Sequence, residues 1–173
     1  MKKVGIIGGS GYTGGELIRL VLHHPRLELG FVYSSTRPGT PLNDTHKDLL
    51  VSQAPDFTAT INPNVDVVFL CLGHGKSVGF LEKNQFSENT VIIDLSNDFR
   101  LKKDTKFNNY DFVYGLPENH REKIEKANAI ANPGCFATAI QLALLPLAKA
   151  GVIKDAIHIN STTGSTGAGV GLS

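Results

Sequence analysis

Apolar residues in this chain gather in short continuous runs, and the runs alternate with segments of helical periodicity. Continuous runs are typical of parallel strands buried on both faces, whereas apolar positions three and four residues apart predict helices. The predicted strands cover residues 4–7, 27–33, 65–72, 91–95 and 127–131. The predicted helices cover residues 12–24, 77–84 and 136–150, with Pro146 as a candidate kink in the last. Strands that alternate with helices indicate the α/β class, with a doubly wound parallel sheet.

The pattern changes near residue 156. Residues 156–162 alternate apolar with polar side chains, which predicts a strand with one solvated face. That strand differs in kind from the earlier ones, so we expect a domain boundary between residues 134 and 135. Residues 1–134 then form the doubly wound domain, and residues 135–173 begin a second, α+β domain. The sequence after Gly164 contains no further periodic apolar segment, so we expect this second domain to be incomplete.

A glycine-rich loop joins the first predicted strand to the first predicted helix. Gly8, Gly11 and Gly14 form a Gly-x-x-Gly-x-x-Gly variant of the dinucleotide fingerprint of Rossmann-type folds. In that fingerprint the first glycine permits a tight turn, the second admits the pyrophosphate, and the third lets helix and strand pack closely. Tyr12 and Thr13 open the helix, whose free N–H groups favour phosphate. The alternative is a glycine-rich surface turn without a ligand.

The end of the second predicted strand indicates which dinucleotide binds. NAD sites usually carry a carboxylate there, which accepts hydrogen bonds from the ribose hydroxyls. Here the segment contains Ser34, Ser35 and Arg37 and no carboxylate. Hydroxyl and guanidinium groups suit a 2′-phosphate, so the pattern predicts NADP(H) as the cofactor. In the alternative, Arg37 is a solvated loop cation.

The loop after the third predicted strand lies at the edge where open α/β sheets bind ligands. It contains Gly73, His74 and Ser77, which we expect to contact the cofactor. For His74, local hydrogen bonds within the loop are an open alternative. Cys71 lies inside the preceding strand, where we expect a packed and inert thiol.

Two charged residues further along the chain are candidates for binding the substrate. Arg100 follows the fourth predicted strand and suits a carboxylate or phosphate group. An ion pair of Arg100 with Asp94 or Asp98 is the competing interpretation. Glu118 ends a compact Tyr-Gly-Leu-Pro-Glu turn, where a solvated acid is the alternative to a site residue.

Cys135 follows the turn sequence Asn-Pro-Gly and begins the last predicted helix. A helix N-terminus carries unpaired N–H groups and partial positive charge, which favour the thiolate, the nucleophilic form of cysteine. A nucleophilic thiol together with a hydride carrier indicates an oxidoreductase that works through a covalent intermediate. The alternative is a small apolar residue packed at a helix start.

Composition narrows these interpretations. The net charge is +1, so the chain lacks the basic field typical of nucleic-acid binding. No apolar run approaches the roughly 20 residues that span a membrane, and nothing at the N-terminus resembles a signal peptide. Two cysteines without zinc-type spacing suit a reducing cytoplasm and predict no metal site.

In order and number, these motifs resemble those of the N-acetyl-gamma-glutamyl-phosphate reductases, a family of the semialdehyde dehydrogenase superfamily. The resemblance rests on segments 8–17, 94–101, 114–118, 132–138 and 164–169. It implies an enzyme of arginine biosynthesis that uses NADPH to reduce an acyl phosphate to an aldehyde. Cys135 would attack the acyl phosphate, expel phosphate and hold the acyl group as a thioester. Arg100, Asn132 and Glu118 are the residues that we expect to bind the substrate. The resemblance also implies a homo-oligomer at full length.

The resemblance has one departure. The general acid/base histidine of the family lies beyond Ser173, and none of the six histidines here aligns with it. We therefore expect this chain to bind NADP(H) better than it turns over substrate. Aspartate-semialdehyde dehydrogenase and a non-catalytic NADP-binding sensor are the alternatives, and the segment 114–118 favours the reductase over the former. The acyl group on the substrate nitrogen, acetyl or succinyl, stays open.

Overall fold

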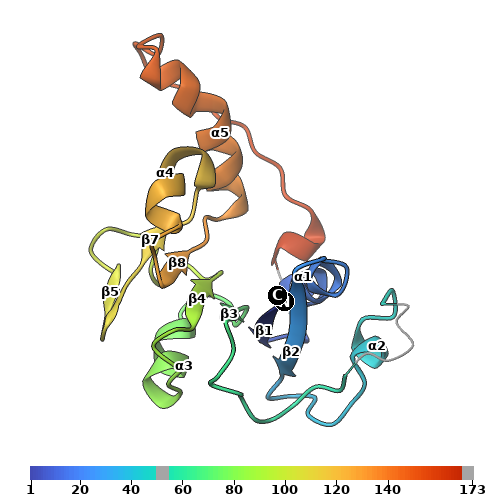
Figure 1. The fold of residues 1–173 in the computed structure, drawn as a ribbon. Helices are drawn as coiled ribbons and strands as arrows, with labels where there is room; N and C mark the ends of the chain where they lie inside the picture. The colour runs from blue at the N-terminus through green and yellow to red at the C-terminus, as the bar shows by residue number, and fades with distance from the viewer. Residues whose placement is uncertain (50–54, 169–173) are drawn as a thin grey trace.

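The computed structural model describes residues 1–49 and 55–168 (Figure 1). Its main feature is a six-stranded sheet of order β2-β1-β3-β4-β8-β7, in which every neighbouring pair is parallel. The strands are β1 (Lys2–Ile7), β2 (Leu27–Tyr33), β3 (Val67–Leu70), β4 (Val91–Asp94), β7 (Val113–Tyr114) and β8 (Ala129–Ala131). The predicted α/β class and parallel sheet are confirmed.

Helices connect most of these strands. They are α1 (Tyr12–Leu22), α2 (Leu42–Thr45), α3 (Ser77–Lys83), α4 (Pro117–Ile124), α5 (Cys135–Lys149) and a 3-10 turn, η1 (Ser165–Ala168). A separate antiparallel hairpin consists of β5 (Lys106–Phe107) and β6 (Tyr110–Asp111). The sequence pattern misses α2, β7 and this hairpin because each element has four residues or fewer.

The sheet buries apolar side chains on both faces, because successive residues of a strand point to opposite sides. On one face, Ile6 and Val32 lie in a buried cluster with Ile18 of α1. On the other face, Leu70 lies in a second buried cluster with Leu81 of α3. Helices thus cover both faces, which confirms the doubly wound arrangement.

The chain reverses direction across the sheet at β1. From β1 it passes to β2 on one side, and from β2 it crosses back to β3 on the other side of β1. In open parallel sheets, ligands bind in the crevice at such a reversal, outside the carboxyl ends of the strands. The loops after β1, β2, β3, β4 and β8 leave the sheet at this edge, and they carry most of the residues singled out from the sequence.

The structure contradicts one prediction made from the sequence. Residues 156–162 form no strand, and Ile157 and Ile159 are 45% and 49% exposed. A strand needs a neighbour to accept and donate its main-chain hydrogen bonds, and no described residue pairs with this segment. Pro146, the candidate kink, stands near the end of α5, and the helix continues past it to Lys149. The other predicted strands and helices agree with the structure to within two residues at each end.

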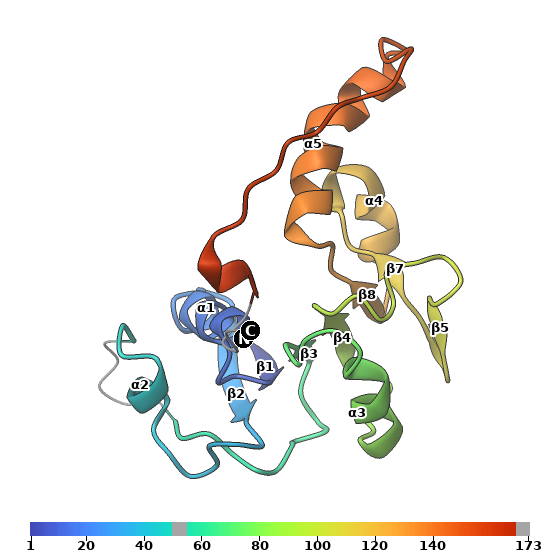
Figure 2. The same cartoon turned by 180° about the vertical axis from the view of Figure 1, so that it is seen from behind.

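Helix α5 projects away from the sheet, and only its first turns lie beside α4 (Figures 1 and 2). Gln141 of α5 donates a hydrogen bond to the Tyr114 hydroxyl at 2.8 Å, which ties the helix to the end of β7. No residue of α5 is fully buried. The segment that follows runs back to η1, which lies beside α1 in both views.

Candidate functional site

The glycine loop follows β1 and makes the tight turn that its sequence predicts. Gly8 has a φ of 82°, and a Cβ on it would lie 2.5 Å from the carbonyl oxygen of Cys71. A Cβ on Gly14 would lie 2.7 Å from the Gly8 oxygen and 2.7 Å from Cα of Gly9. Glycine at positions 8 and 14 is therefore required by the turn and by the close packing of α1 on this loop.

Gly11 has a different environment. It is the N-cap of α1 in extended conformation, and the nearest atom to an added Cβ is 3.7 Å away. No described residue accepts a hydrogen bond from the N–H groups of Tyr12, Thr13 or Gly14. Open space beside Gly11 and three free N–H groups at a helix N-terminus are what a pyrophosphate requires.

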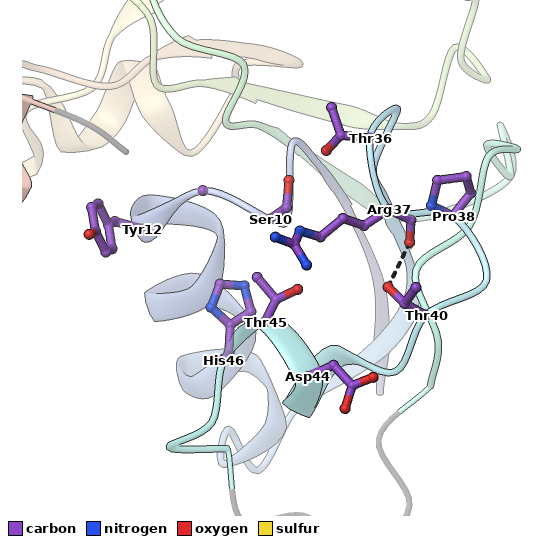
Figure 3. A pocket seen from close by; sticks show the side chains of 10 residues that line it. Ser10, Tyr12, Thr36, Arg37, Pro38, Thr40, Asp44, Thr45 and His46 are labelled. Carbon is purple, nitrogen blue, oxygen red and sulfur yellow. Dashed lines mark hydrogen bonds between the residues drawn. The ribbon is translucent and has the colours of Figure 1, made fainter. Parts of the chain in front are cut away.

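A cavity of about 870 Å³ opens beside this loop (Figure 3). Its walls come from the glycine loop, from the segment after β2, and from α2 with the residue that follows it. The guanidinium of Arg37 points into the cavity, between Ser10 and Thr45 (Figure 3). Within residues 1–49 and 55–168, Arg37 forms no ion pair. A cation directed into a cavity next to a helix N-terminus with free N–H groups suits an anionic group such as phosphate.

Ser34 joins the segment after β2 to the glycine loop. Its side chain is buried, and its Oγ donates to Oγ of Ser10 at 3.1 Å. The same oxygen accepts from the main-chain N–H of Arg37 at 3.3 Å. Ser35 is exposed and faces no such constraint. Ser34 thus orients the segment, while Ser35 and Arg37 remain accessible.

Asp98 joins the loops after β3 and β4. Its carboxylate accepts from the N–H groups of Gly75 at 2.6 Å, Ser77 at 2.9 Å and Val78 at 3.3 Å, and so caps α3. Burial acts to raise the pKa of Asp98, but these hydrogen bonds outweigh it and hold the pKa below its ordinary value. Gly73 begins the same loop at a φ of 84°, with no atom within 4 Å of an added Cβ.

His74 and Ser77 both take part in this loop network. His74 is exposed, and its Nδ1 accepts from the N–H of Asn97 at 3.1 Å, which is the local hydrogen bond of the alternative interpretation. Ser77 is buried, and its hydroxyl donates to Asp94 at 2.5 Å. Burial raises the pKa of Asp94, and the hydrogen bonds from Ser77 and Ser96 offset this only in part. The hydroxyl of Ser77 is therefore occupied by Asp94.

Cys135 is exposed at the first position of α5, after the N-cap Gly134. Arg100 reaches this turn from the loop after β4. Its Nε donates to the Asn132 carbonyl and its Nη2 to the Leu95 carbonyl, both at 2.8 Å. A Cβ on Gly134 would lie 3.0 Å from Nη1 of Arg100, so the guanidinium lies against the residue before the thiol. The competing interpretation, an ion pair with a nearby aspartate, is not found among the described residues.

The other two substrate candidates also lie near the start of α5 or α4. Asn132 is exposed, and its Nδ2 donates to the Pro133 carbonyl at 3.1 Å. Its main-chain N–H donates to the Asp94 carbonyl at 2.8 Å, which holds the turn against the end of β4. Glu118 is exposed in the first turn of α4, the helix beside the first turns of α5.

The two cysteines lie in contrasting environments. Cys71 is packed against the buried cluster under α1, and burial raises the pKa of its thiol to about 12. It therefore stays protonated at neutral pH, as the sequence predicts for an inert thiol. Cys135 is the exposed thiol of the pair.

Sequence reasoning missed the contribution of α2 to the cavity. Thr45 and His46 line it, and His46 contacts the glycine loop. No local signal could reveal this, because α2 is four residues long and Gly9, the residue that His46 contacts, lies 37 positions from His46.

Two kinds of feature are absent from residues 1–49 and 55–168. No group of three or more His, Cys, Asp or Glu side chains there is arranged to hold a metal ion. Among the helices of this part of the chain, none is long and apolar enough to cross a membrane.

Comparison with known proteins places these features in a family. Residues 3–127 match the model "Semialdehyde dehydrogenase, NAD binding domain", and residues 135–173 match "Semialdehyde dehydrogenase, dimerisation domain". N-acetyl-gamma-glutamyl-phosphate reductases from Flavobacterium johnsoniae and Christiangramia forsetii are 64% and 57% identical to the whole chain. The chain covers 53% of each of these relatives, so it spans about half their length.

A solved structure adds agreement in fold. Aspartate-semialdehyde dehydrogenase from Candida albicans, determined with NADP, matches with a TM-score of 0.61 at 20% identity. The match covers 88% of this chain and 48% of that protein. Since the identity is low, this similarity concerns the fold alone, and the reductases are the nearer relatives in sequence. The glycine loop, the parallel sheet and a family match over residues 3–127 together show that the chain belongs to the semialdehyde dehydrogenase family.

Proposed function

We propose that this chain binds NADP(H) and carries the nucleophile of an N-acetyl-gamma-glutamyl-phosphate reductase. The observation that supports this most is one sheet edge that holds both the phosphate-binding loop after β1 and the exposed Cys135 after β8. The names of the relatives at 64% and 57% identity support the substrate. The reaction converts N-acetyl-glutamyl 5-phosphate to the 5-semialdehyde and phosphate.

The residues around the cavity fit the cofactor. The N–H groups of Tyr12, Thr13 and Gly14 would bind the pyrophosphate in the open space beside Gly11. Arg37 would bind the 2′-phosphate, which distinguishes NADP(H) from NAD(H). When bound, NADPH supplies the hydride that reduces the acyl group. The related fold determined with NADP supports this choice.

The residues around Cys135 fit the acyl-transfer step. The thiolate attacks the acyl carbon, a C–S bond forms, the acyl C–O bond breaks, and phosphate departs with the electron pair. Nη1 of Arg100, beside Gly134, would stabilise the charge of the departing phosphate. The other two guanidinium nitrogens are bound to main-chain carbonyls and hold the group in place. Asn132 and Glu118 would contact the rest of the substrate.

Titration with NADPH and NADH tests the cofactor assignment. Arg37→Ala should lower NADPH affinity about 10- to 100-fold, because it removes charged hydrogen bonds to phosphate, and leave NADH affinity unchanged. Arg26→Ala, an exposed arginine outside the cavity, is the matched control. Equal affinity of the unchanged chain for the two cofactors would refute the assignment.

Acylation tests the nucleophile and the substrate. On mixing with N-acetyl-glutamyl phosphate, the chain should release about one equivalent of phosphate and gain an acyl adduct at Cys135 by mass spectrometry. Cys135→Ser should release no more phosphate than the substrate does alone in buffer, and Cys71→Ser should behave like the unchanged chain. Equal release from aspartyl phosphate would contradict the substrate assignment, and release by Cys135→Ser above that background would contradict the nucleophile.

The proposal extends to the domain boundary, the oligomeric state and the cellular compartment of the protein. The boundary between residues 134 and 135 separates the cofactor-binding unit from the beginning of the substrate domain. A homo-oligomer is supported by the match of residues 135–173 to a dimerisation domain. Two free thiols and a biosynthetic role support the cytoplasm as the compartment. Sedimentation of the full-length protein checks the oligomeric state.

A further inference from the structure

His46 lies directly after α2 and contacts Gly9 in the glycine loop that follows β1. Its Nε2 lies 2.7 Å from the carbonyl oxygen of Gly9. Because a carbonyl oxygen only accepts hydrogen bonds, Nε2 carries the proton and donates. This contact spans 37 residues and connects the far wall of the cavity to the phosphate-binding loop.

The imidazole ring fills the space that a side chain at position 15 would occupy. A Cβ on Gly15 would lie 2.5 Å from both Cε1 and Nδ1 of His46. The dinucleotide fingerprint accounts for Gly14 but not for a second glycine beside it. The structure supplies the reason, since only glycine at position 15 lets the histidine ring reach the loop.

The ring is also held by its own neighbours. The main-chain N–H of His46 donates to the Leu42 carbonyl at 2.9 Å, and its carbonyl accepts from Leu49 at 3.0 Å. The ring of Phe57 lies 6.2 Å away in a tilted arrangement. Figure 3 shows the imidazole beside α1 and Thr45 at the cavity wall. A side chain restrained in this way loses little further freedom when it donates to Gly9.

The donated hydrogen bond determines the direction of one peptide group. The Gly9 carbonyl and the Ser10 N–H belong to the same planar unit and point in opposite directions. The N–H groups of Gly8 and Gly9 are already bound to the Tyr33 carbonyl, at 3.0 and 3.1 Å. His46 therefore restrains the remaining peptide of the turn, with Ser10 on the cavity wall.

We propose that His46 is a positioning residue for the cofactor phosphates, acting through the Gly9–Ser10 peptide. The inference rests on the proposed NADP(H) binding. His46 acts on the loop that holds the pyrophosphate, which NADPH and NADH share. Its loss should therefore weaken both cofactors equally, unlike the loss of Arg37.

The test compares matched variants of the full chain by fluorescence titration with NADPH and NADH. Gln places an amide N–H where imidazole Nε2 stands, whereas Asn is too short to reach Gly9. His46→Gln should bind both cofactors within about 3-fold of the unchanged chain, and His46→Asn should bind both about 10-fold more weakly. His23→Asn, on an exposed histidine outside the cavity, should change neither.

A second variant keeps the test independent of the histidine itself. Gly15→Ala should displace the ring and weaken both cofactors by a similar factor, and its combination with His46→Asn should add little. Unchanged affinity in His46→Asn would overturn the inference, as would equal losses in His46→Gln and His46→Asn. If the unchanged chain binds neither cofactor, the proposed function fails. If the unchanged chain binds both cofactors and His46→Asn binds them equally well, only the role of His46 fails.

Discussion

Substitution of two glycines in the same loop should separate a packing role from a ligand-binding role. In Gly14→Ala, the new Cβ would lie 2.7 Å from two main-chain atoms, the Gly8 oxygen and Cα of Gly9. Contact distances between carbon atoms are about 3.5–4.0 Å, so α1 and the loop must separate by roughly an ångström. Overpacking of this kind costs about 1–3 kcal/mol, and the better helix propensity of alanine returns about 1 kcal/mol.

Both overlapped atoms belong to the main chain and cannot rotate away, so a cost in the upper part of that range, about 2–3 kcal/mol, applies. The expected net loss for Gly14→Ala is then about 1–2 kcal/mol, or a fall in Tm of roughly 2–8 °C for a chain of this size. NADPH affinity should fall too, because the loop moves. In Gly11→Ala, by contrast, the nearest atom is 3.7 Å from the new Cβ and the backbone conformation is an ordinary one for alanine. Alanine is a poorer N-cap than glycine, so the unfolding free energy should fall by about 0.5 kcal/mol, less than for Gly14→Ala. NADPH affinity should nevertheless fall about 10-fold or more, because the methyl group occupies the approach of the pyrophosphate.

Thermal unfolding by circular dichroism and NADPH titration by fluorescence measure the two effects separately. Gly79→Ala, inside α3 with no atom within 4 Å of the new Cβ, is the control and should raise Tm slightly without altering affinity. An unchanged Tm in Gly14→Ala would refute the close helix–loop packing. Unchanged NADPH affinity in Gly11→Ala would refute the approach of the pyrophosphate at that position.

Three further predictions concern the loops after β3, β4 and β8. The pKa of Asp98 is lower in the folded chain than in the unfolded chain, so the Asp98 carboxylate stabilises the folded state. This stabilisation is fully present above about pH 4 and is lost as the pH falls through the pKa of Asp98 in the folded chain. Asp98→Asn should therefore lower stability by about 1–3 kcal/mol at pH 7 and converge with the unchanged chain in acid, and a constant difference in Tm across pH 2–7 would contradict this. Iodoacetamide at pH 8 should modify Cys135 alone, because the Cys71 thiol has a pKa of about 12, and peptide mapping that finds Cys71 modified in the folded chain would contradict it. Arg100→Ala should slow phosphate release from the acyl phosphate about 10-fold or more with NADPH affinity unchanged, whereas loss of both would indicate a collapsed turn instead.

Local patterns were sufficient for the order of five of the six strands of the main sheet and for the central motifs. Continuous apolar runs identified the long strands, and helical spacing identified α1, α3 and α5, because burial on both faces leaves a periodic record in the residues themselves. The glycine loop and Cys135 are local features as well. A turn and the first residue of a helix depend on neighbours in sequence, so both could be located without a structure. The domain boundary and the roles of the site residues stay predictions.

Contacts between distant residues were decided by tertiary structure alone. His46 binds Gly9 across 37 positions, Asp98 caps a helix 21 positions earlier, and Arg100 binds the Asn132 carbonyl instead of an aspartate. Each side chain has several chemically acceptable partners in the sequence, and only the fold determines which one lies within hydrogen-bond distance. The segment 156–162 shows that a local pattern can also predict an element that the tertiary structure does not form. Its alternation is that of a strand, but a strand exists only where a second strand pairs with it, and no described residue does.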